Sequence, residues 1–381
     1  MTAMLLSSLW LGPVLAAALA VPAPAETWLQ DGYGAGHTFY NPGESVVNAA
    51  TVHSLKTRWV VTPAPDADSC PLDPVAPIVA DGRMFVLEPA GNQVGAYDSA
   101  TGRKLWTSAI GTLEATGLAV SGDAVYVTDM ACGSRGNDDS NVIALDAGTG
   151  EQRWNRLWGY TTVTFVLTHG VLIASGYCDV CEESAAYQVR AWTLAGGEEV
   201  WTRTGMTLAG PVASRDGVVL LSSPSRQRTE AVRAVDGRLR WGTGLSYEAA
   251  AADPVRNQFY VMSRAGLRAL GTTTGRTVWT VRNEAGELAT DGRRVYVASA
   301  GRVSAYQAAQ GRRSWTRVLR APGNPVRAGG LLYVTSGRRL MILAPGSGAG
   351  VRTFGNATGH VVAAGGRLFV TNGRTIKAFA P

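Results

Sequence analysis

Short apolar runs recur along the chain, and most of them come in pairs separated by two turn residues. Clear examples are IVADGRMFVL (78–87), LAVSGDAVYVT (118–128), VASRDGVVLLS (212–222) and LATDGRRVYVAS (288–299). Short runs rich in Val, Leu and Tyr are typical of β-strands, and turns such as Asp-Gly and Ser-Gly supply the positive φ angles of a tight hairpin. The pattern recurs in VLTHGVLIAS, VRAGGLLYVTS and VAAGGRLFVTN, and a degenerate copy is AADPVRNQFYVMS. The sequence therefore predicts eight hairpins.

A second unit alternates with the hairpins. It reads A-x-D-x-x-T-G-x-x-x-W in AYDSATGRKLW (96–106) and in ALDAGTGEQRW (144–154). Aligned on the final aromatic residue, seven units end 36 to 48 residues apart, at Trp106, Trp154, Trp201, Trp241, Trp279, Trp315 and Phe354. Each has Ala ten residues earlier (Ala96, Ala144, Ala191, Ala231, Ala269, Ala305, Ala344) and Gly four residues earlier (Gly102, Gly150, Gly197, Gly237, Gly275, Gly311, Gly350). Repeats of this length are typical of β-propeller blades.

The second unit also predicts how neighbouring blades dock. Its Ala lies on the third strand, where a small side chain lets the next blade approach. Asp98 and Asp146, with Thr101 and Thr149, can hydrogen-bond the backbone of the turn. The aromatic residue of the fourth strand fills the space between blades. We therefore predict an all-β fold, a single eight-bladed β-propeller with four antiparallel strands per blade.

The last blade is one strand short. The eighth hairpin leads to TIKAFAP, and the chain ends there on a third strand. Near the N-terminus, TVHSLKTRWVV (51–61) carries Trp59, which belongs to none of the seven aligned units. We predict that 51–61 is the outer strand of blade eight and pairs with 374–380, because closure removes exposed sheet edges. This divides the chain into residues 1–25, a lead-in segment 26–50 and the propeller 51–381.

Residues 1–25 have the features of a signal peptide. MLLSSLWLGPVLAAALAVPAPA is an uncharged apolar run, and Ala23, Pro24 and Ala25 fit an A-x-A cleavage site. The alternative is an uncleaved membrane anchor, which the helix-breaking Gly12 and Pro13 disfavour. We expect cleavage after Ala25 and a secreted or cell-envelope location. No other segment is expected to span a membrane.

The four cysteines, Cys70, Cys132, Cys178 and Cys181, all precede residue 190. In an exported chain they predict disulfides. We expect Cys70–Cys132 to bridge blades one and two and Cys178–Cys181 to close a local loop, with other pairings open. Zinc binding and redox chemistry by CDVC are alternatives, but no second Cys pair and no helix accompany that motif.

The repeated units resemble the quinoprotein-type (PQQ-binding-like) β-propeller superfamily, whose blades carry the same tryptophan-docking motif. The size and the single eight-bladed ring are similar to the propeller lipoprotein of the outer-membrane barrel assembly machinery. WLQDGYGAGHTFYNPGESVVN (28–48) resembles the lead-in segment of that group.

The resemblance implies fold more than activity. Quinoprotein alcohol dehydrogenases have a pair of adjacent cysteines over the quinone, whereas the two cysteines that lie nearest each other here are Cys178 and Cys181. Their calcium ligands and catalytic Asp find no matching position. We expect a non-catalytic propeller without a cofactor. The alternative is a PQQ- or metal-dependent oxidoreductase with a site at the central channel, where PQQ would be bound with calcium.

The long insertions are expected on one face of the ring. They are TPAPDADSCPLDPVAP, DMACGSRGNDDSN, GYCDVCEESAAYQ and SPSRQRTE. Two of them bring together four carboxylates that could bind calcium, Asp138, Asp139, Glu182 and Glu183. A solvated acidic loop is the simpler explanation. The four histidines, His37, His53, His169 and His360, are scattered and make no Ser-His-Asp set.

Charge divides the chain into an acidic and a basic half. Residues 1–190 carry a net charge of −10, and residues 191–381 carry +16. Because blades follow one another round a ring, one half of the disc is predicted to be basic. Much of this charge is expected to be a solvated rim, with Arg238, Arg276, Arg312 and Arg338 at turns. As a binding surface it would suit a protein or an anionic envelope polymer, and a groove for nucleic acid is not indicated. We expect a monomer that binds through its loop-rich face.

Overall fold

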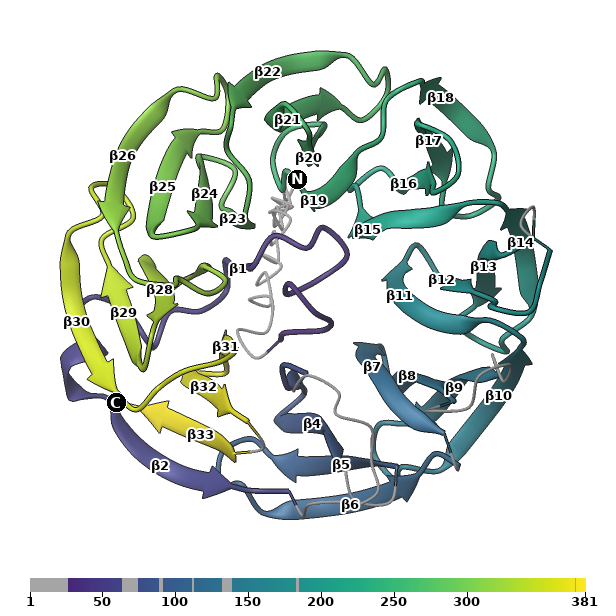
Figure 1. The fold of residues 1–381 in the computed structure, drawn as a ribbon. Coiled ribbons are helices and arrows are strands. Elements are labelled where there is room, and N and C mark those ends of the chain that lie inside the picture. The colour runs from purple at the N-terminus through teal and green to yellow at the C-terminus, as the bar shows by residue number, and fades with distance from the viewer. Residues whose placement is uncertain are drawn as a thin grey trace, which may run out of the picture.

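The structure is a computed structural model that describes residues 27–63, 75–88, 92–111, 113–131, 139–182, 185–373 and 375–381. Eight antiparallel sheets of four strands are arranged in a ring (Figure 1), which confirms the predicted eight-bladed propeller. One sheet gains a short fifth strand from the N-terminal segment. The helix in the described residues is η1 (Val52–Ser54), a single 3-10 turn, and no described helix is long and apolar enough to span a membrane.

The strands follow the chain from the innermost to the outermost position of each blade. Blades one and two are β3 (Ile78–Ala80), β4 (Arg83–Glu88), β5 (Gln93–Asp98), β6 (Lys104–Ala109) and β7 (Glu114–Ser121), β8 (Ala124–Met130), β9 (Ser140–Asp146), β10 (Gln152–Trp158). Blades three and four are β11 (Thr161–Thr168), β12 (Val171–Tyr177), β13 (Tyr187–Thr193), β14 (Glu199–Thr204) and β15 (Thr207–Ala213), β16 (Val218–Ser223), β17 (Arg228–Arg233), β18 (Leu239–Thr243).

The second half of the ring repeats this order. Blades five and six are β19 (Glu248–Ala252), β20 (Gln258–Ser263), β21 (Gly266–Gly271), β22 (Thr277–Arg282) and β23 (Glu287–Thr290), β24 (Arg294–Ser299), β25 (Arg302–Gln307), β26 (Arg313–Val318). Blade seven is β27 (Val326–Ala328), β28 (Leu331–Ser336), β29 (Arg339–Leu343), β30 (Gly350–Gly355), with β1 (Tyr40–Asn41) added in parallel to β27. Blade eight is β31 (Val361–Ala364), β32 (Arg367–Asn372), β33 (Thr375–Ala380) and β2 (Lys56–Val61).

The ring closes through blade eight. Strand β2 pairs antiparallel with β33, and Trp59 lies opposite Ala378 while Thr57 lies opposite Phe379. The predicted closure by an N-terminal strand is confirmed. The strand begins at Lys56 rather than at residue 51, because 51–55 form the 3-10 turn that leads into it.

The lead-in segment occupies the centre of the ring, which the sequence did not predict. We call residues 28–41 the hub (Figure 1). The hub contacts the innermost strands of all eight blades in chain order. The contacts are Trp28 with Val79, Leu29 with Val120, Gln30 with Leu167, Ala35 with Ala213, Gly36 with Ala252, Thr38 with Thr290, Phe39 with Arg327 and Asn41 with Ala363. These hydrogen bonds are 2.7 to 3.1 Å long, so the hub joins the whole circle.

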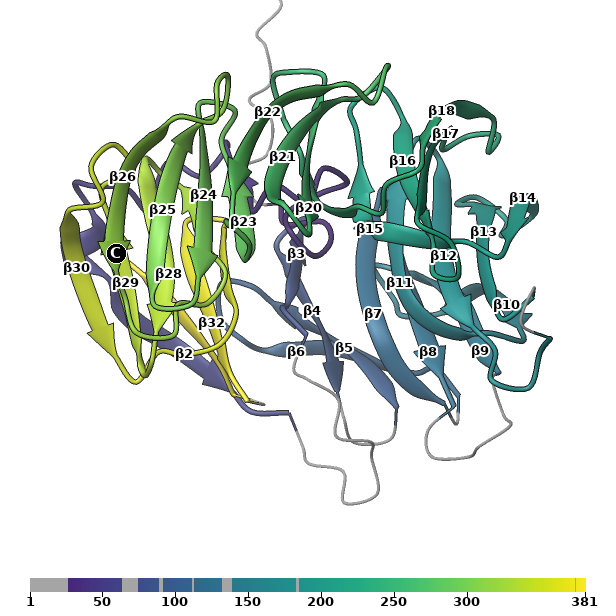
Figure 2. The ribbon, with the colours of Figure 1, turned by 45° about the horizontal axis from the view of Figure 1, so that its top comes forward.

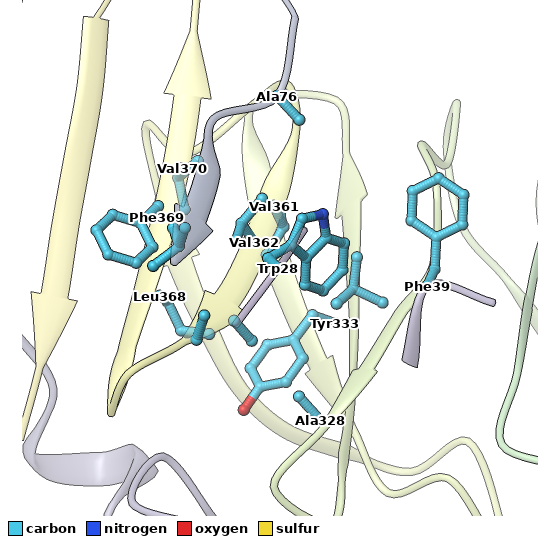
Figure 3. Close-up of a cluster of buried hydrophobic side chains, with 14 of the residues drawn as sticks. Trp28, Phe39, Ala76, Ala328, Tyr333, Val361, Val362, Leu368, Phe369 and Val370 are labelled. Carbon is cyan, nitrogen blue, oxygen red and sulfur yellow. The ribbon is translucent and has the colours of Figure 1, made fainter. Parts of the chain in front are cut away.

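The hub is also part of the hydrophobic core. The Trp28 side chain is 1% exposed and belongs to the same buried cluster as Tyr333, Val361 and Val362. Figure 3 shows its indole beside these side chains, with Phe39 on the other side. Burial of an indole of this size stabilises the folded state by several kcal/mol (roughly 3–5 kcal/mol by truncation). The hub is therefore held by packing as well as by hydrogen bonds.

In seven of the eight blades, the outermost strand contacts the turn between the third and fourth strands of the next blade. In blade two, Trp154 donates through Nε1 to the Leu194 carbonyl at 3.2 Å and lies against Gly197. That glycine has a φ of +70°, and a Cβ there would lie 2.8 Å from the indole. The same contacts recur at Trp59 (Ala100, Gly102), Trp106 (Ala147, Gly150), Trp201 (Ala234, Gly237), Trp241 (Thr272, Gly275), Trp279 (Ala308, Gly311) and Trp315 (Pro345, Gly348).

The seventh repeat corrects the alignment made from the sequence. Strand pairing places Arg352 opposite Ile342, where the other blades place Trp opposite Ala. In this blade the docking unit therefore lies two residues earlier than the alignment placed it. Ala344, Gly350 and Phe354 match the repeat spacing by coincidence. Phe354 still packs between blades seven and eight, 5.6 Å from the Phe379 ring. Arg352 contacts the Val52 and Leu55 carbonyls, because the chain ends meet where the next turn would be.

Candidate functional site

The two faces of the ring are built differently. Each innermost strand meets the hub at or near its C-terminal end, where the first-to-second turn begins, so the hub closes this turn face. The second-to-third loops and the connections between blades lie on the opposite, loop face. Figure 2 shows the innermost strands β7, β11 and β15 as the long ones, with β3 and β23 shorter. The hub closes the turn face, and the cavities of the central channel are lined by the loop-face ends of the innermost strands, so the channel opens toward the loop face.

The blade-three loop on this face is tied down. Cys178 and Cys181 form a disulfide, which gives the predicted local loop. The Cys178 backbone nitrogen donates to the Ala186 carbonyl at 2.8 Å, and the Tyr160 hydroxyl donates to the Ala185 carbonyl at 3.0 Å. Binding loops that are stiffened in this way lose less entropy when they contact a partner.

Several predicted loop residues lie outside the described residues. These are Cys70, Cys132, Asp138 and Glu183. The structure therefore leaves the Cys70–Cys132 bridge and the complete carboxylate cluster as predictions. Asp139 and Glu182 are described, and within the described ranges no three Asp, Glu, His or Cys side chains gather as a metal site would require.

Apolar side chains are exposed near the disulfide loop. Val163 and Val180 are 63% and 70% exposed, and Tyr177 is at the exposed end of β12. Isolated apolar residues are common on surfaces, but a group of them on one loop cluster is typical of contact surfaces. This group lies on the acidic half of the ring.

A basic groove lies on the same face between blades four and five. It has a volume of about 970 Å³. Three arginines line it, Arg226 from the β16–β17 loop, Arg264 from the β20–β21 turn and Arg268 from β21. Leu245, which is 47% exposed, and Met262 give it an apolar wall. The groove therefore combines positive charge with apolar surface.

Arg268 points to the kind of group that would bind in the groove. Its guanidinium lies over the Tyr247 ring, 5.8 Å from the ring centre, and Nη1 donates to the Tyr247 hydroxyl at 3.1 Å. Its Nε atom is buried and finds no acceptor within the described part of the chain. An unpaired buried donor is costly, and a carboxylate or carbonyl oxygen from a partner would satisfy it.

The channel itself is a cup whose floor is the hub. Two cavities of about 380 and 470 Å³ open above the hub and share Thr164 and Pro211 as lining residues. Asp31 lines one cavity and His37 the other. Their side chains form an ion pair with 3.1 Å between Asp31 Oδ2 and His37 Nε2.

The hydrogen bonds of His37 define its charge. Nδ1 lies 2.9 Å from the Ala250 carbonyl and Nε2 lies 3.1 Å from the Asp31 carboxylate. Both neighbours are acceptors, so both ring nitrogens must donate, as in an imidazolium. Burial lowers the pKa of His37, but the Asp31 carboxylate and the Ala250 carbonyl outweigh it and raise this pKa above its ordinary value. With no free nitrogen, His37 is a structural cation rather than a general base.

Asp31 is the other half of this pair. Burial acts to raise the pKa of its carboxyl, but the hydrogen bond and positive charge of His37 outweigh burial and lower the pKa below its ordinary value. The Asp31 side chain is still 55% exposed, and its exposed part borders the first cavity. The floor of the cup therefore presents an ionised carboxylate.

Residues 35–182 and 185–378 match the profile of the family described as "Outer membrane protein assembly factor BamB". A quinohemoprotein alcohol dehydrogenase, ADH IIB of Pseudomonas putida, is 26% identical over 249 residues, which is 61% of this chain and 33% of that protein. The matched region thus spans about a third of that relative.

Solved structures show the same fold. The quinohemoprotein alcohol dehydrogenase of Comamonas testosteroni superposes with a TM-score of 0.68 at 15% identity, covering 94% of this chain and 81% of that chain. BamB of Moraxella catarrhalis superposes with a TM-score of 0.62 at 20% identity, covering 86% and 98% of the two chains. At these identities the likeness shows the fold alone.

The described lining of the cup is a poor match for pyrroloquinoline quinone. That cofactor is a flat polycarboxylate, which needs cationic partners. Among the described residues that line the two cavities, none is Lys or Arg, and Glu248 and Glu287 add to the charge of Asp31. His37, the cation of the floor, already has a carboxylate partner. The donor set thus disfavours a polyanion in the cup.

Proposed function

The chain belongs to the family of BamB-type propellers, and on that premise we propose that it is a non-catalytic scaffold that binds a protein partner through its loop face. The observation that carries the proposal is the basic groove between blades four and five, with the unpaired Arg268 Nε and the apolar wall. The partner surface that fits it is acidic with an apolar centre. We further propose that the protein is exported after cleavage of residues 1–25 and acts in the cell envelope.

Three features support a binding role for this face. The disulfide and the hydrogen bonds of the blade-three loop hold the surface in one shape. Exposed apolar and charged side chains lie on a rigid ring, which is where binding residues are usually found. Positive charge on the groove also speeds association with an anionic partner. The relatives named as assembly factors support a protein rather than a polymer as the partner.

The proposal is tested by charge reversal in the groove. An affinity-tagged Arg226→Glu/Arg264→Glu variant is compared with wild type for proteins recovered from cross-linked native envelope. Arg238→Glu/Arg276→Glu is the matched control, because these arginines are exposed at turn-face positions. We expect wild type and control to recover the same acidic protein and the groove variant to lose it. Equal recovery by all three would overturn the proposal.

The rival function has its own test. Purified protein is mixed with PQQ and Ca²⁺, and quinone absorbance and dye-linked oxidation of alcohols or aldoses are measured. We expect neither stoichiometric quinone binding nor oxidation. Both together would show that the chain is a quinoprotein oxidoreductase.

A further inference from the structure

One loop of the chain has the chemistry that complements the basic groove. We call residues 177–182 of blade three the acidic knob. Within it, Val180 is 70% exposed and lies in sequence between Asp179 and Glu182, which are both exposed. The Cys178–Cys181 disulfide closes this short loop, so the loop loses little conformational freedom when it is contacted. The knob therefore presents an acidic surface with an apolar centre, which is the surface that fits the groove.

The groove between blades four and five is the complement of the knob. Arg226, Arg264 and Arg268 line it, and Glu248 is the one carboxylate among its described lining residues. Arg226 and Arg264 are exposed, and no carboxylate of the described residues forms an ion pair with either one. Leu245 is 47% exposed on the apolar wall, where an apolar side chain would pack. The groove thus matches the knob in charge and in apolar surface.

The knob and the groove lie on the same face of the ring but do not meet within one chain. None of residues 177–182 lines the groove. The knob follows β12 of blade three, and the groove begins in the next blade round the ring (Figure 1). A two-fold axis parallel to the loop face, near the boundary between blades three and four, would bring the knob of each copy to the groove of the other. Such an isologous interface makes each contact twice.

The same axis matches the charges of the two halves of the ring. It places blades one to three of one copy opposite blades four to seven of the other. Residues 1–190, which hold blades one and two and most of blade three, carry a net charge of −10, and residues 191–381 carry +16. On the loop face of blades five to seven, the exposed arginines include Arg282, Arg320 and Arg338. Opposite charges over this area attract two copies and favour this orientation.

We propose that the mature chain pairs with a second copy through the loop face, with each acidic knob in the basic groove of the other copy. The pairing relies on charge more than on a large apolar area, so it is reversible and weakens as salt screens the charges. The expected monomer is then the dilute form. An acidic protein partner must displace the second copy to reach the groove. The inference rests on the groove of the proposed function, but self-association and partner binding can each occur without the other.

A charge exchange tests the pairing in solution. Sedimentation velocity of the mature chain, residues 26–381, is measured over a range of concentrations for wild type, for the groove variant Arg226→Glu/Arg264→Glu and for the knob variant Asp179→Arg/Glu182→Arg. We expect wild type to dimerise as its concentration rises. Each variant alone should dimerise about 100-fold more weakly, because like charges then meet across the interface. An equimolar mixture of the two variants should dimerise like wild type, since an acidic groove meets a basic knob at one contact and a basic groove meets an acidic knob at the other.

The control variant reverses two charges on the turn face. Arg238→Glu/Arg276→Glu alters exposed residues there and should dimerise like wild type. Thermal melting checks that all variants fold. Monomeric wild type at every concentration, equal weakening in the control, variants that dimerise as strongly as wild type, or a mixture that stays monomeric while wild type dimerises would each overturn the inference. Recovery of an acidic protein from the envelope tests the proposed function separately.

Discussion

The turn face and the loop face of the ring differ in what their polar groups contact. On the turn face, Asp146 accepts hydrogen bonds from Gly148 and Thr149 within its own turn, and Trp154 donates to the next blade. On the loop face, Arg226 and Arg264 are exposed at the mouth of a groove. The Asp and Trp groups of the repeated unit on the turn face are directed into the fold, whereas the groove of the loop face leaves groups available for a partner.

The difference teaches where to look for function in a propeller of this family. A residue whose hydrogen bonds are internal, such as Trp154, reports on stability when it is changed. A residue with an unused donor, such as Arg268, reports on binding. Variants on the two faces should therefore separate these two properties.

Removing the hub should have the largest effect. A chain that begins at residue 42 loses the hydrogen bonds to all eight innermost strands and the buried Trp28 and Phe39 side chains. Loss of Trp28 alone is expected to cost about 3–5 kcal/mol, so we expect the truncated chain to lose cooperative thermal unfolding. Replacing 224–227 on the loop face with two glycines is the control and should change the melting temperature little. Cooperative melting of the truncated chain near the wild-type temperature would contradict the role of the hub.

A single docking tryptophan should have the next largest effect. Trp154→Ala removes a side chain that is buried between blades two and three, and should lower the free energy of unfolding by about 3–5 kcal/mol. Leu157→Ala on the same strand is the matched control, because its side chain is exposed and should cost less than about 0.5 kcal/mol. Urea denaturation measures both. A loss below about 1 kcal/mol at Trp154 would show that the blade junction does not depend on it.

The ion pair of the hub should have a smaller, pH-dependent effect. The pKa of the Asp31 carboxyl is lowered from 3.8. The stability that the ionised carboxylate contributes is therefore lost as pH falls through the folded-state pKa, which lies below 3.8. The pKa of His37 is raised from 6.5. The stability that the His37 cation contributes is therefore fully present below pH 6.5 and is lost as pH rises through the folded-state pKa. Glu287 adds to the charge that stabilises the His37 cation, and His360 faces Asp31.

The variant His37→Gln tests this dependence by urea denaturation at a series of pH values. The free-energy difference from wild type should be greatest between about pH 4 and 6.5 and decline on both sides. It should be about 1 kcal/mol or less, because the Asp31 side chain is half exposed. A difference that is the same at every pH would mean that His37 acts only by packing.

The repeated parts of the fold could be predicted because they depend on local patterns. Two-residue turns, strand periodicity and the A-x-D-x-x-T-G-x-x-x-W unit are each complete within a few residues. Closure by Trp59 followed from counting strands. The seventh repeat was misaligned because Phe354 satisfied the aromatic spacing while the register places Arg352 there. Only strand pairing reveals such a shift.

The hub, the groove and the cup could not be predicted because their contacts are distant in sequence. Gln30 bonds Leu167, which is 137 residues away, and His37 bonds Ala250, which is 213 residues away. Segment 28–41 has no strand or helix period that would indicate these partners. The groove was suggested only in part, by the arginines of SPSRQRTE, since Arg264 and Arg268 come from the next blade.

The most direct test of the two-face account uses two leucines of similar exposure. Leu245 lies in the loop-face groove and is 47% exposed, and Leu239 starts β18 next to the turn-face turn of the same blade and is 51% exposed. Each is replaced by a photo-crosslinking phenylalanine analogue in the native cell envelope. We expect a crosslinked protein partner at position 245 and none at position 239. A partner captured at 239 but not at 245 would contradict it.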